Sequence, residues 1–238
     1  MDIVRSPYAH AKIKSINTEK ALAHPGVAAV ITGETLKEYN LHMMPTLMSD
    51  TQMVLPIDKV CYQAQEVAAV VATDRYSAAD GVELVEVEYE PLPVVVDPHK
   101  ATDPDAAIIR DDKEGQDNNH IFHWEAGDKS GTDDIFTNAD VTVKEDIYLP
   151  RIHVASIETC GCSSESDSVT RRLTVWLTTQ APHAIRTVVA LVAGHVGLQE
   201  DKIRIISPDI GGGFGGKVPV YPGYVIAIAA SVVTGLPI

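Results

Sequence analysis

The chain has 238 residues, of which 45% are hydrophobic and 22% are charged, as is ordinary for a globular protein. Its net charge of -14 argues against binding to nucleic acid or to an anionic membrane surface, because both would repel it. The longest apolar run, Val225–Val233, has about half of the roughly 20 residues that a membrane-spanning helix needs, so we expect no membrane span.

The N-terminal part carries signals for short strands and a helix. Gly26–Thr32 is a compact β-rich run, and the unbroken apolar run Glu66–Ala72 suits a strand covered on both faces. Asp74 is placed to cap a helix over Arg75–Leu84. Apolar residues alternate with glutamates over Val85–Tyr89, which predicts a further strand. Together these elements predict a small α+β unit.

An acidic stretch separates the two halves of the chain. Residues 98–120 hold many Asp and Asn side chains and too little apolar surface to pack. We therefore expect a first domain at 1–100, a linker at 101–120 and a second domain at 121–238. The fold class predicted for the whole chain is α+β.

Beyond the linker, predicted strands alternate with predicted helices. A helix is expected to begin at Pro182, because proline suits the first helical turn, and to end at Gly197. A buried helix rich in small residues is expected over Tyr224–Val233. The predicted strands are Ala139–Tyr148, Leu173–Thr178 and Ile203–Ile206.

The sequence ends at Gly235–Ile238, directly after this apolar helix and without a polar tail. Chain termini usually lie at the surface and are easily solvated. Two interpretations stay open: a buried C-terminal helix or, as we favour, a chain cut within a domain.

Gly211–Lys217, between a predicted strand and a predicted helix, contains five glycines in seven positions. Glycines let main-chain N–H groups approach a bulky anionic or oxo-bearing ligand without a Cβ in the way. The spacing lacks the Ser or Thr of a phosphate loop, because Val218 follows Lys217, and it matches a dinucleotide fingerprint only weakly. A tight turn without a ligand is the alternative.

Gln180 lies where a predicted strand gives way to a predicted helix, in Thr178–His183. A neutral amide can donate a hydrogen bond to an oxo or carbonyl oxygen without adding charge. Taken alone, Gln180 is also compatible with an ordinary polar loop residue.

Three cysteines, Cys61, Cys160 and Cys162, form an odd and sparse set that does not suggest a disulfide framework. Met1–Ser15 lacks the apolar core of a signal peptide, so we expect a cytoplasmic protein. The Cys-x-Cys pair with nearby His153 invites a metal interpretation. Zinc would need about four ligands, and no second cysteine pair exists. We therefore expect buried free thiols and no metal ligand in this chain.

Taken in order, these segments resemble the molybdenum hydroxylases of the xanthine oxidase and aldehyde oxidase family. Arg5–Ile13, Pro25–Val30 and Glu83–Asp97 look like the family's small N-terminal α/β hammerhead domain. Thr179–His183 and Asp209–Lys217 look like the first two cofactor-contacting loops of its molybdopterin-binding region. The resemblance spans essentially the whole chain. It implies a hammerhead-like domain followed by the first, incomplete part of a molybdopterin-binding α+β domain.

The resemblance also implies roles for particular residues. Gln180 would be a catalytic and cofactor-binding residue that hydrogen-bonds an oxo ligand of molybdenum. The backbone of Gly212, Gly213, Phe214 and Gly215 would pack against the metal centre. The implied cofactor is molybdopterin cytosine dinucleotide with molybdenum.

Three details resemble the carbon monoxide dehydrogenase branch of the family: Asn40–Leu47, Glu158–Cys162 and Val220–Tyr224. That branch implies oxidation of carbon monoxide to carbon dioxide with water as the oxygen source, and copper bridged to molybdenum by sulfur. Electrons would leave through an iron–sulfur subunit and an FAD-binding subunit, in a dimer of heterotrimers. Those partners must be separate chains, since this one has no iron–sulfur cysteine spacing.

The sequence departs from the family pattern at Gly216, where carbon monoxide dehydrogenases tend to have Asn, and at Ala64, where many relatives have Gly. The family's copper-binding Cys loop, its catalytic Glu and most pterin-binding segments would lie beyond Ile238, and Cys160 and Cys162 do not match the copper motif. We therefore expect the isolated chain to be inactive. The alternatives are an aldehyde or N-heterocycle hydroxylase of the same family and, from another class, a non-catalytic module that holds a nucleotide or phosphate on the glycine loop.

Overall fold

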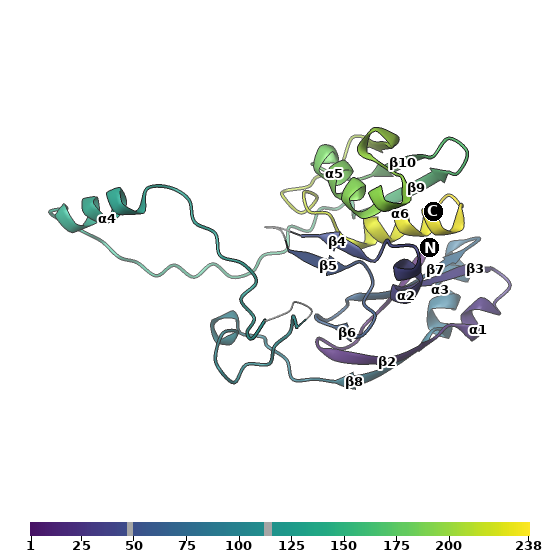
Figure 1. Cartoon of the computed structure of the whole chain (residues 1–238), viewed down its shortest axis with the longest axis horizontal. Helices are drawn as coiled ribbons and strands as arrows, with labels where there is room; N and C mark the ends of the chain where they lie inside the picture. Colours follow the sequence, from purple (N-terminus) through teal and green to yellow (C-terminus); the bar gives the residue numbers. More distant parts are fainter. Residues whose placement is uncertain (47–49, 112–115) are drawn as a thin grey trace.

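A computed structural model describes residues 1–46, 50–111 and 116–238. Within these ranges the strands form three three-stranded sheets and one hairpin beside several helices, so the predicted α+β class is confirmed. Figure 1 shows α6 (Pro222–Thr234) between the C-terminal sheet and the N-terminal strands. Four residues that contributed to the sequence argument lie outside the described ranges: Leu47, Asp112, Lys113 and Glu114.

The first N-terminal sheet has the order β1 (Asp2–Arg5), β7 (Glu66–Ala72), β3 (Val27–Thr32), and all its pairs are antiparallel. The central strand β7 is almost wholly buried, as its unbroken apolar run predicts. Helix α3 (Arg75–Leu84) packs against this sheet. Its predicted cap is confirmed, because the Asp74 carboxylate accepts hydrogen bonds from the backbone N–H groups of Tyr76 and Ser77 in the first turn.

The second N-terminal sheet has the order β6 (Lys59–Val60), β2 (Ala11–Asn17), β8 (Glu86–Pro91). The predicted alternation along β8 is confirmed, because Val87 and Tyr89 are half-buried while the intervening glutamates are more exposed. This alternation leaves one face of the sheet against the small N-terminal core and the other in solvent.

A hairpin and two short helices complete the N-terminal half. The hairpin pairs β4 (Met43–Pro45) with β5 (Thr51–Met53) and lies beside helix α5 of the C-terminal half. The helices are α1 (Glu19–Leu22) and α2 (Gly33–Glu38), and both contact β3.

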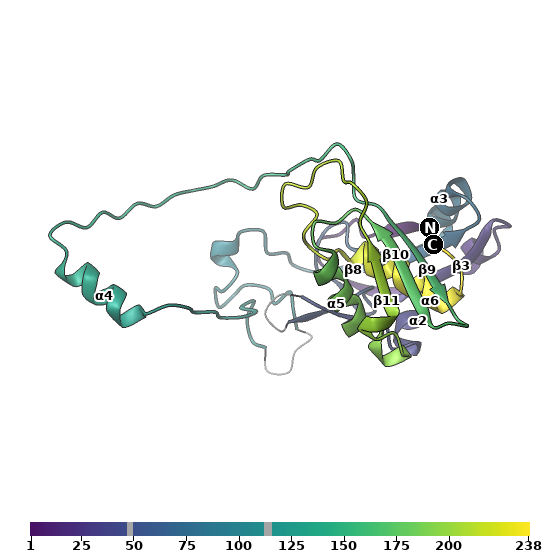
Figure 2. The ribbon, with the colours of Figure 1, turned by 90° about the horizontal axis from the view of Figure 1, so that it is seen from above.

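A long exposed stretch joins the two halves. Its described residues include a 3-10 turn, η1 (Pro98–Lys100), and the helix α4 (Lys129–Asn138), which stands away from the rest of the molecule in both views (Figures 1 and 2). The strand predicted over Ala139–Tyr148 is wrong. Val141 and Val143 are 80% and 83% exposed there, and no described strand lies beside the segment. An alternating apolar pattern forms a strand only where a partner accepts its backbone hydrogen bonds and buries one face.

The C-terminal sheet consists of β9 (Cys162–Asp167), β10 (Arg172–Leu177) and β11 (Ile203–Ile206). β10 lies in the middle, antiparallel to β9 and parallel to β11. The parallel pair places Trp176 opposite Ile206, so the two strands end at the same edge of the sheet.

Helix α5 (Pro182–Ala193) begins at Pro182 as predicted but ends before Gly197. A tighter turn, η2 (Gly194–Val196), follows it, and Gly197 then adopts a left-handed conformation with φ of 88° that stops the helix. Such tightening is common where a helix ends. A second turn, η3 (Glu200–Lys202), leads into β11. In the described part of the chain, no helix is both long and apolar enough to cross a membrane.

The main hydrophobic cluster takes side chains from both sides of the exposed stretch. Leu36 and Met44 from the N-terminal half meet Leu173, Ile185 and Ile226 from the C-terminal half. The packing of α6 against both β9 and β7 explains how one cluster spans the two halves. The division into domains at 101–120 stays a prediction.

We expect limited proteolysis to cut the exposed stretch first. Lys129, Lys144 and Arg151 are exposed trypsin sites there, and the last two lie in segments without helix or strand. Arg75 is a matched internal control, since its side chain is also exposed but its backbone belongs to α3. Mass spectrometry of the earliest fragments checks this order. Initial cleavage between residues 66 and 90 would contradict it.

Candidate functional site

Two loops that were singled out in the sequence meet at one edge of the C-terminal sheet. One follows β10 and contains Gln180, and the other follows β11 and contains Gly211–Lys217. β10 and β11 are parallel neighbours, so both loops leave the sheet at the carboxyl ends of their strands (Figure 2). Ligands bind preferentially at this edge of sheets that contain parallel strands.

The Gln180 amide is held directly by the glycine loop. Its Oε1 accepts hydrogen bonds from the backbone N–H groups of Gly215 and Lys217, each at 3.2 Å. The Gln180 backbone N–H donates to the Lys217 carbonyl at 3.0 Å, and the Thr179 hydroxyl donates to the same carbonyl at 3.1 Å. Two donors at Oε1 determine which end of the amide is oxygen. Among the described residues, no acceptor takes a hydrogen bond from Nε2, so this NH₂ group is available to a ligand.

The loop requires glycine at its positions for two separate structural reasons. Gly212 and Gly215 adopt φ values of 90° and 88°, which side-chain-bearing residues rarely adopt. At Gly213 the reason is space, since an added Cβ would lie 2.4 Å from Cδ and Oε1 of Gln180. Phe214, also left-handed with φ of 48°, is 74% exposed. The structure thus brings Gln180 into contact with Gly213 and Gly215, with Gly212 and Phe214 in the same turn.

An ion pair between buried Lys217 and partly exposed Glu158 anchors the loop. Lys217 Nζ donates to Glu158 Oε2 at 2.6 Å, and the Gly211 N–H donates to the same oxygen at 2.7 Å. These two hydrogen bonds, first that of Lys217 and then that of Gly211, lower the pKa of Glu158 below its ordinary value. Sequence reasoning gave Glu158 no role, because 59 residues separate it from Lys217. The sequence did carry one signal for such a partner. Lys217 lies between two elements that were predicted to be buried, and a buried lysine requires a counter-charge somewhere in the fold.

The two neighbouring cysteines differ in exposure. Cys160 is exposed and lines a cavity of about 210 Å³ beside Lys217 and Tyr221, whereas Cys162 in β9 is partly buried. The expectation of buried free thiols is therefore wrong for Cys160, which lies just before β9, and holds only in part for Cys162. Burial raises the pKa of Cys162 to about 12. Among the residues that the structure describes, no group of three or more His, Cys, Asp or Glu side chains is arranged for a metal ion.

We expect iodoacetamide at pH 8 to modify Cys160 and to leave Cys162 unmodified. The thiolate is the reactive form, and a pKa of about 12 leaves only about one Cys162 in ten thousand ionised at that pH. Tandem mass spectrometry of the alkylated chain distinguishes the two positions. Unfolding in urea should make Cys162 react like Cys160. Comparable modification of both in the folded protein would contradict this expectation.

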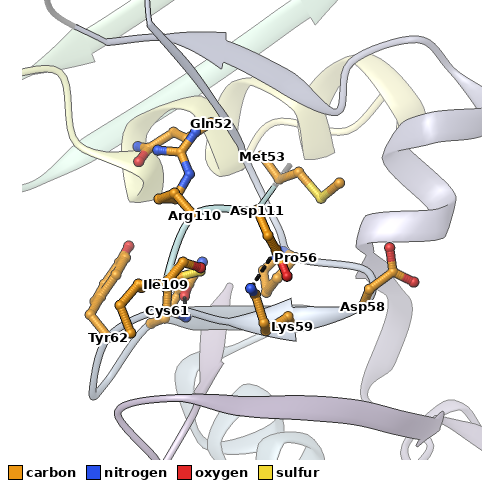
Figure 3. A pocket seen from close by; sticks show the side chains of 11 residues that line it. Gln52, Met53, Pro56, Asp58, Lys59, Cys61, Tyr62, Ile109, Arg110 and Asp111 are labelled. Carbon is orange, nitrogen blue, oxygen red and sulfur yellow. Dashed lines mark hydrogen bonds and ion pairs between the residues drawn. The ribbon is translucent and has the colours of Figure 1, made fainter. Parts of the chain in front are cut away.

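A second cavity, of about 500 Å³, shares no lining residue with the glycine loop (Figure 3). Lys59 Nζ lies 2.5 Å from Asp111 Oδ1 there, and the Cys61 thiol donates to the Ile109 carbonyl at 3.6 Å. Burial, with a contribution from neighbouring Glu66, raises the pKa of Tyr62 to about 12. These contacts tie residues 109–111 of the predicted linker to the N-terminal half.

Two sequence families match the chain. Residues 1–93 match the aldehyde oxidase and xanthine dehydrogenase a/b hammerhead domain. Residues 112–238, more than half of the chain, match the molybdopterin cofactor-binding domain. The second match includes both loops of the site.

Known proteins resemble the chain over nearly all of its length. It is 53% identical to the carbon monoxide dehydrogenase large chain of Hydrogenophaga pseudoflava, over 100% of this chain and 30% of that one. It is 36% identical to the nicotine 6-hydroxylase large subunit of Paenarthrobacter nicotinovorans, over 92% of this chain and 26% of that one. A crystal structure of a Cu,Mo-CO dehydrogenase in its carbon monoxide reduced state superposes with a TM-score of 0.87 at 55% identity, over 99% of this chain and 30% of that one. The chain thus spans about a third or less of the length of these relatives.

Proposed function

Because the chain belongs to the molybdopterin cofactor-binding domain family, we propose that it forms part of the molybdenum-binding subunit of a carbon monoxide dehydrogenase. The reaction of the whole enzyme would convert carbon monoxide and water into carbon dioxide, two protons and two electrons. The observation that carries the proposal is the Gln180 amide, whose oxygen is occupied by the glycine loop and whose NH₂ group is left to a ligand. The chain is more similar to the carbon monoxide dehydrogenase chain than to the nicotine hydroxylase subunit. This difference in identity supports carbon monoxide as the substrate.

The residues at the site fit the cofactor of this family. Gln180 Nε2 would donate a hydrogen bond to an oxo ligand of molybdenum, because a neutral amide stabilises such an oxygen without a competing charge. The backbone of Gly212, Gly213, Phe214 and Gly215 would pack against the metal centre, since of these four residues Phe214 alone carries a side chain. When bound, the cofactor supplies the two-electron redox chemistry, and these residues bind and orient it.

The same proposal includes the finer form of the cofactor and its partners. The cofactor would be molybdopterin cytosine dinucleotide, with copper beside molybdenum held by residues outside this chain. An iron–sulfur subunit and an FAD-binding subunit would accept the electrons, in a dimer of heterotrimers. We place this assembly in the cytoplasm, in keeping with the three free thiols.

The glycine loop offers little to a phosphate. Most of its N–H groups already donate within the protein: Gly211 to Glu158, Gly215 and Lys217 to Gln180, and Gly212 and Gly216 to carbonyls of the loop region. A phosphate site needs several convergent free N–H groups. The geometry therefore disfavours a module that binds a nucleotide or phosphate here.

Metal analysis of the purified holoenzyme tests the proposal. We expect molybdenum and copper in equimolar amounts, with carbon monoxide oxidation by the same preparation. Molybdenum without copper, together with oxidation of an N-heterocycle or aldehyde, would favour the hydroxylase alternative that the similarity to nicotine 6-hydroxylase supports. A folded, fully assembled protein without molybdenum would overturn the proposal.

A further inference from the structure

The Glu158 carboxylate contacts both ends of the glycine loop through a single oxygen. Oε2 accepts from the Gly211 N–H at the start of the loop, at 2.7 Å, and from Lys217 Nζ at its end, at 2.6 Å. The loop between these two contacts contains three left-handed residues, Gly212, Phe214 and Gly215. Gly212 and Gly215 adopt this conformation freely, but a side-chain-bearing residue such as Phe214 keeps it only where its surroundings hold it.

Burial makes the contact with Lys217 strong. The Lys217 side chain is 2% exposed, and among the described residues Glu158 is the carboxylate within ion-pair distance of it. The Glu158 side chain, at 39% exposed, still reaches solvent. A buried ammonium without a counter-charge is far less stable than a half-exposed carboxylate without a partner. Lys217 is therefore held in place by Glu158 more than Glu158 is held by Lys217.

Lys217 passes this constraint to Gln180. Its side chain bonds to Glu158, while its backbone N–H donates to Gln180 Oε1 and its carbonyl accepts from the Gln180 N–H. We propose that Glu158 is a positioning residue: through Lys217 and the glycine loop, it sets the direction in which the Gln180 NH₂ group points. This inference rests on the function proposed above, in which that NH₂ group meets the cofactor.

A double-mutant cycle in the holoenzyme tests the proposal. Glu158→Ala should lower kcat about tenfold when Gln180 is present, the size of coupling within one hydrogen-bond network, and should have little effect in a Gln180→Ala background. Glu158→Gln should lie between wild type and Glu158→Ala, because its amide oxygen can accept the same two hydrogen bonds without the charge. Glu86→Ala, which removes the carboxylate of an exposed pair with Lys20, is the matched control and should leave kcat unchanged.

Hydrogen exchange provides a readout that does not depend on turnover. Mass spectrometry of the peptide 211–217 follows the amides of Gly215 and Lys217. These amides should exchange faster than in wild type in both Glu158→Ala and Gln180→Ala, and the double variant should exchange no faster than either single variant. If Glu158→Ala yields no folded protein, Lys217→Met replaces it in the same cycle, because water can solvate the carboxylate left behind.

The outcomes separate this inference from the proposed function. The positioning role of Glu158 would be overturned if Glu158→Ala lowered kcat by the same factor with and without Gln180 and left hydrogen exchange in 211–217 unchanged. The proposed function would then still stand. A wild-type holoenzyme without molybdenum would instead overturn the proposed function.

Discussion

The Gln180→Glu variant of the holoenzyme should lose about a hundredfold in kcat while it keeps its molybdenum, since removal of one pre-organised donor typically costs about 3 kcal/mol of barrier. One carboxylate oxygen of glutamate can still accept the hydrogen bonds from Gly215 and Lys217, so the loop should keep its shape. The other oxygen replaces the NH₂ donor by an acceptor with negative charge. It would then repel an electron-rich ligand instead of stabilising it.

Steady-state kinetics and metal analysis on the same preparation check this result. Gln199→Glu makes the identical chemical change at an exposed position just before η3 and serves as the matched control. It should leave both kcat and metal content unchanged. Full turnover by Gln180→Glu would mean that the NH₂ group does not take part in the reaction.

Elements with strong local signals were predictable from the sequence. Asp74 before Arg75–Leu84 and Pro182 at the start of α5 mark helix starts by their own chemistry, a side-chain acceptor and a fixed φ. The apolar run of β7 likewise requires cover on both faces wherever it lies in the fold. Such signals act within a few residues, so the rest of the chain does not need to be known.

Elements that depend on a distant partner were not predictable. β9 has the sequence Cys-Ser-Ser-Glu-Ser-Asp, which lacks an apolar alternation. It is a strand because β10 pairs with it and because the backbone of Ser164 exchanges two hydrogen bonds of 2.8 Å with Ile238. Ala139–Tyr148 shows the converse error, since it has the alternation and lacks the partner among the described residues.

The candidate site likewise has parts that the sequence predicts and parts that it does not. Gln180 and the glycine loop were found because each follows a predicted strand and carries an unusual local composition. Their mutual contact depends on the parallel pairing of β10 with β11, which periodicity alone does not indicate. The role of Glu158 was missed because a lone glutamate carries no local sign of the buried ammonium that it meets.

Gly213→Val should lose molybdenum before any effect on turnover can be measured. The Cβ of residue 213 would lie 2.4 Å from Cδ and Oε1 of Gln180, so the amide must leave its place or the loop must move. Either change breaks the hydrogen bonds from Gly215 and Lys217 to Oε1. Overpacking of this kind costs about 1–3 kcal/mol, so we expect the affinity for the cofactor to fall roughly tenfold and the molybdenum content to fall with it.

Molybdenum per folded protein, measured beside the melting temperature, checks this expectation and separates lost binding from lost folding. Gly194→Val is the matched control, because an added Cβ there meets nothing within 4 Å and Gly194 has a helical φ of -59°. The control should keep its metal. The contrast with Gln180→Glu is decisive, since one variant should lose the metal and the other only the rate. If Gly213→Val and Gln180→Glu both keep full molybdenum and near-normal turnover, these two loops do not contact the metal centre, and the roles that the family resemblance implies do not hold for this chain.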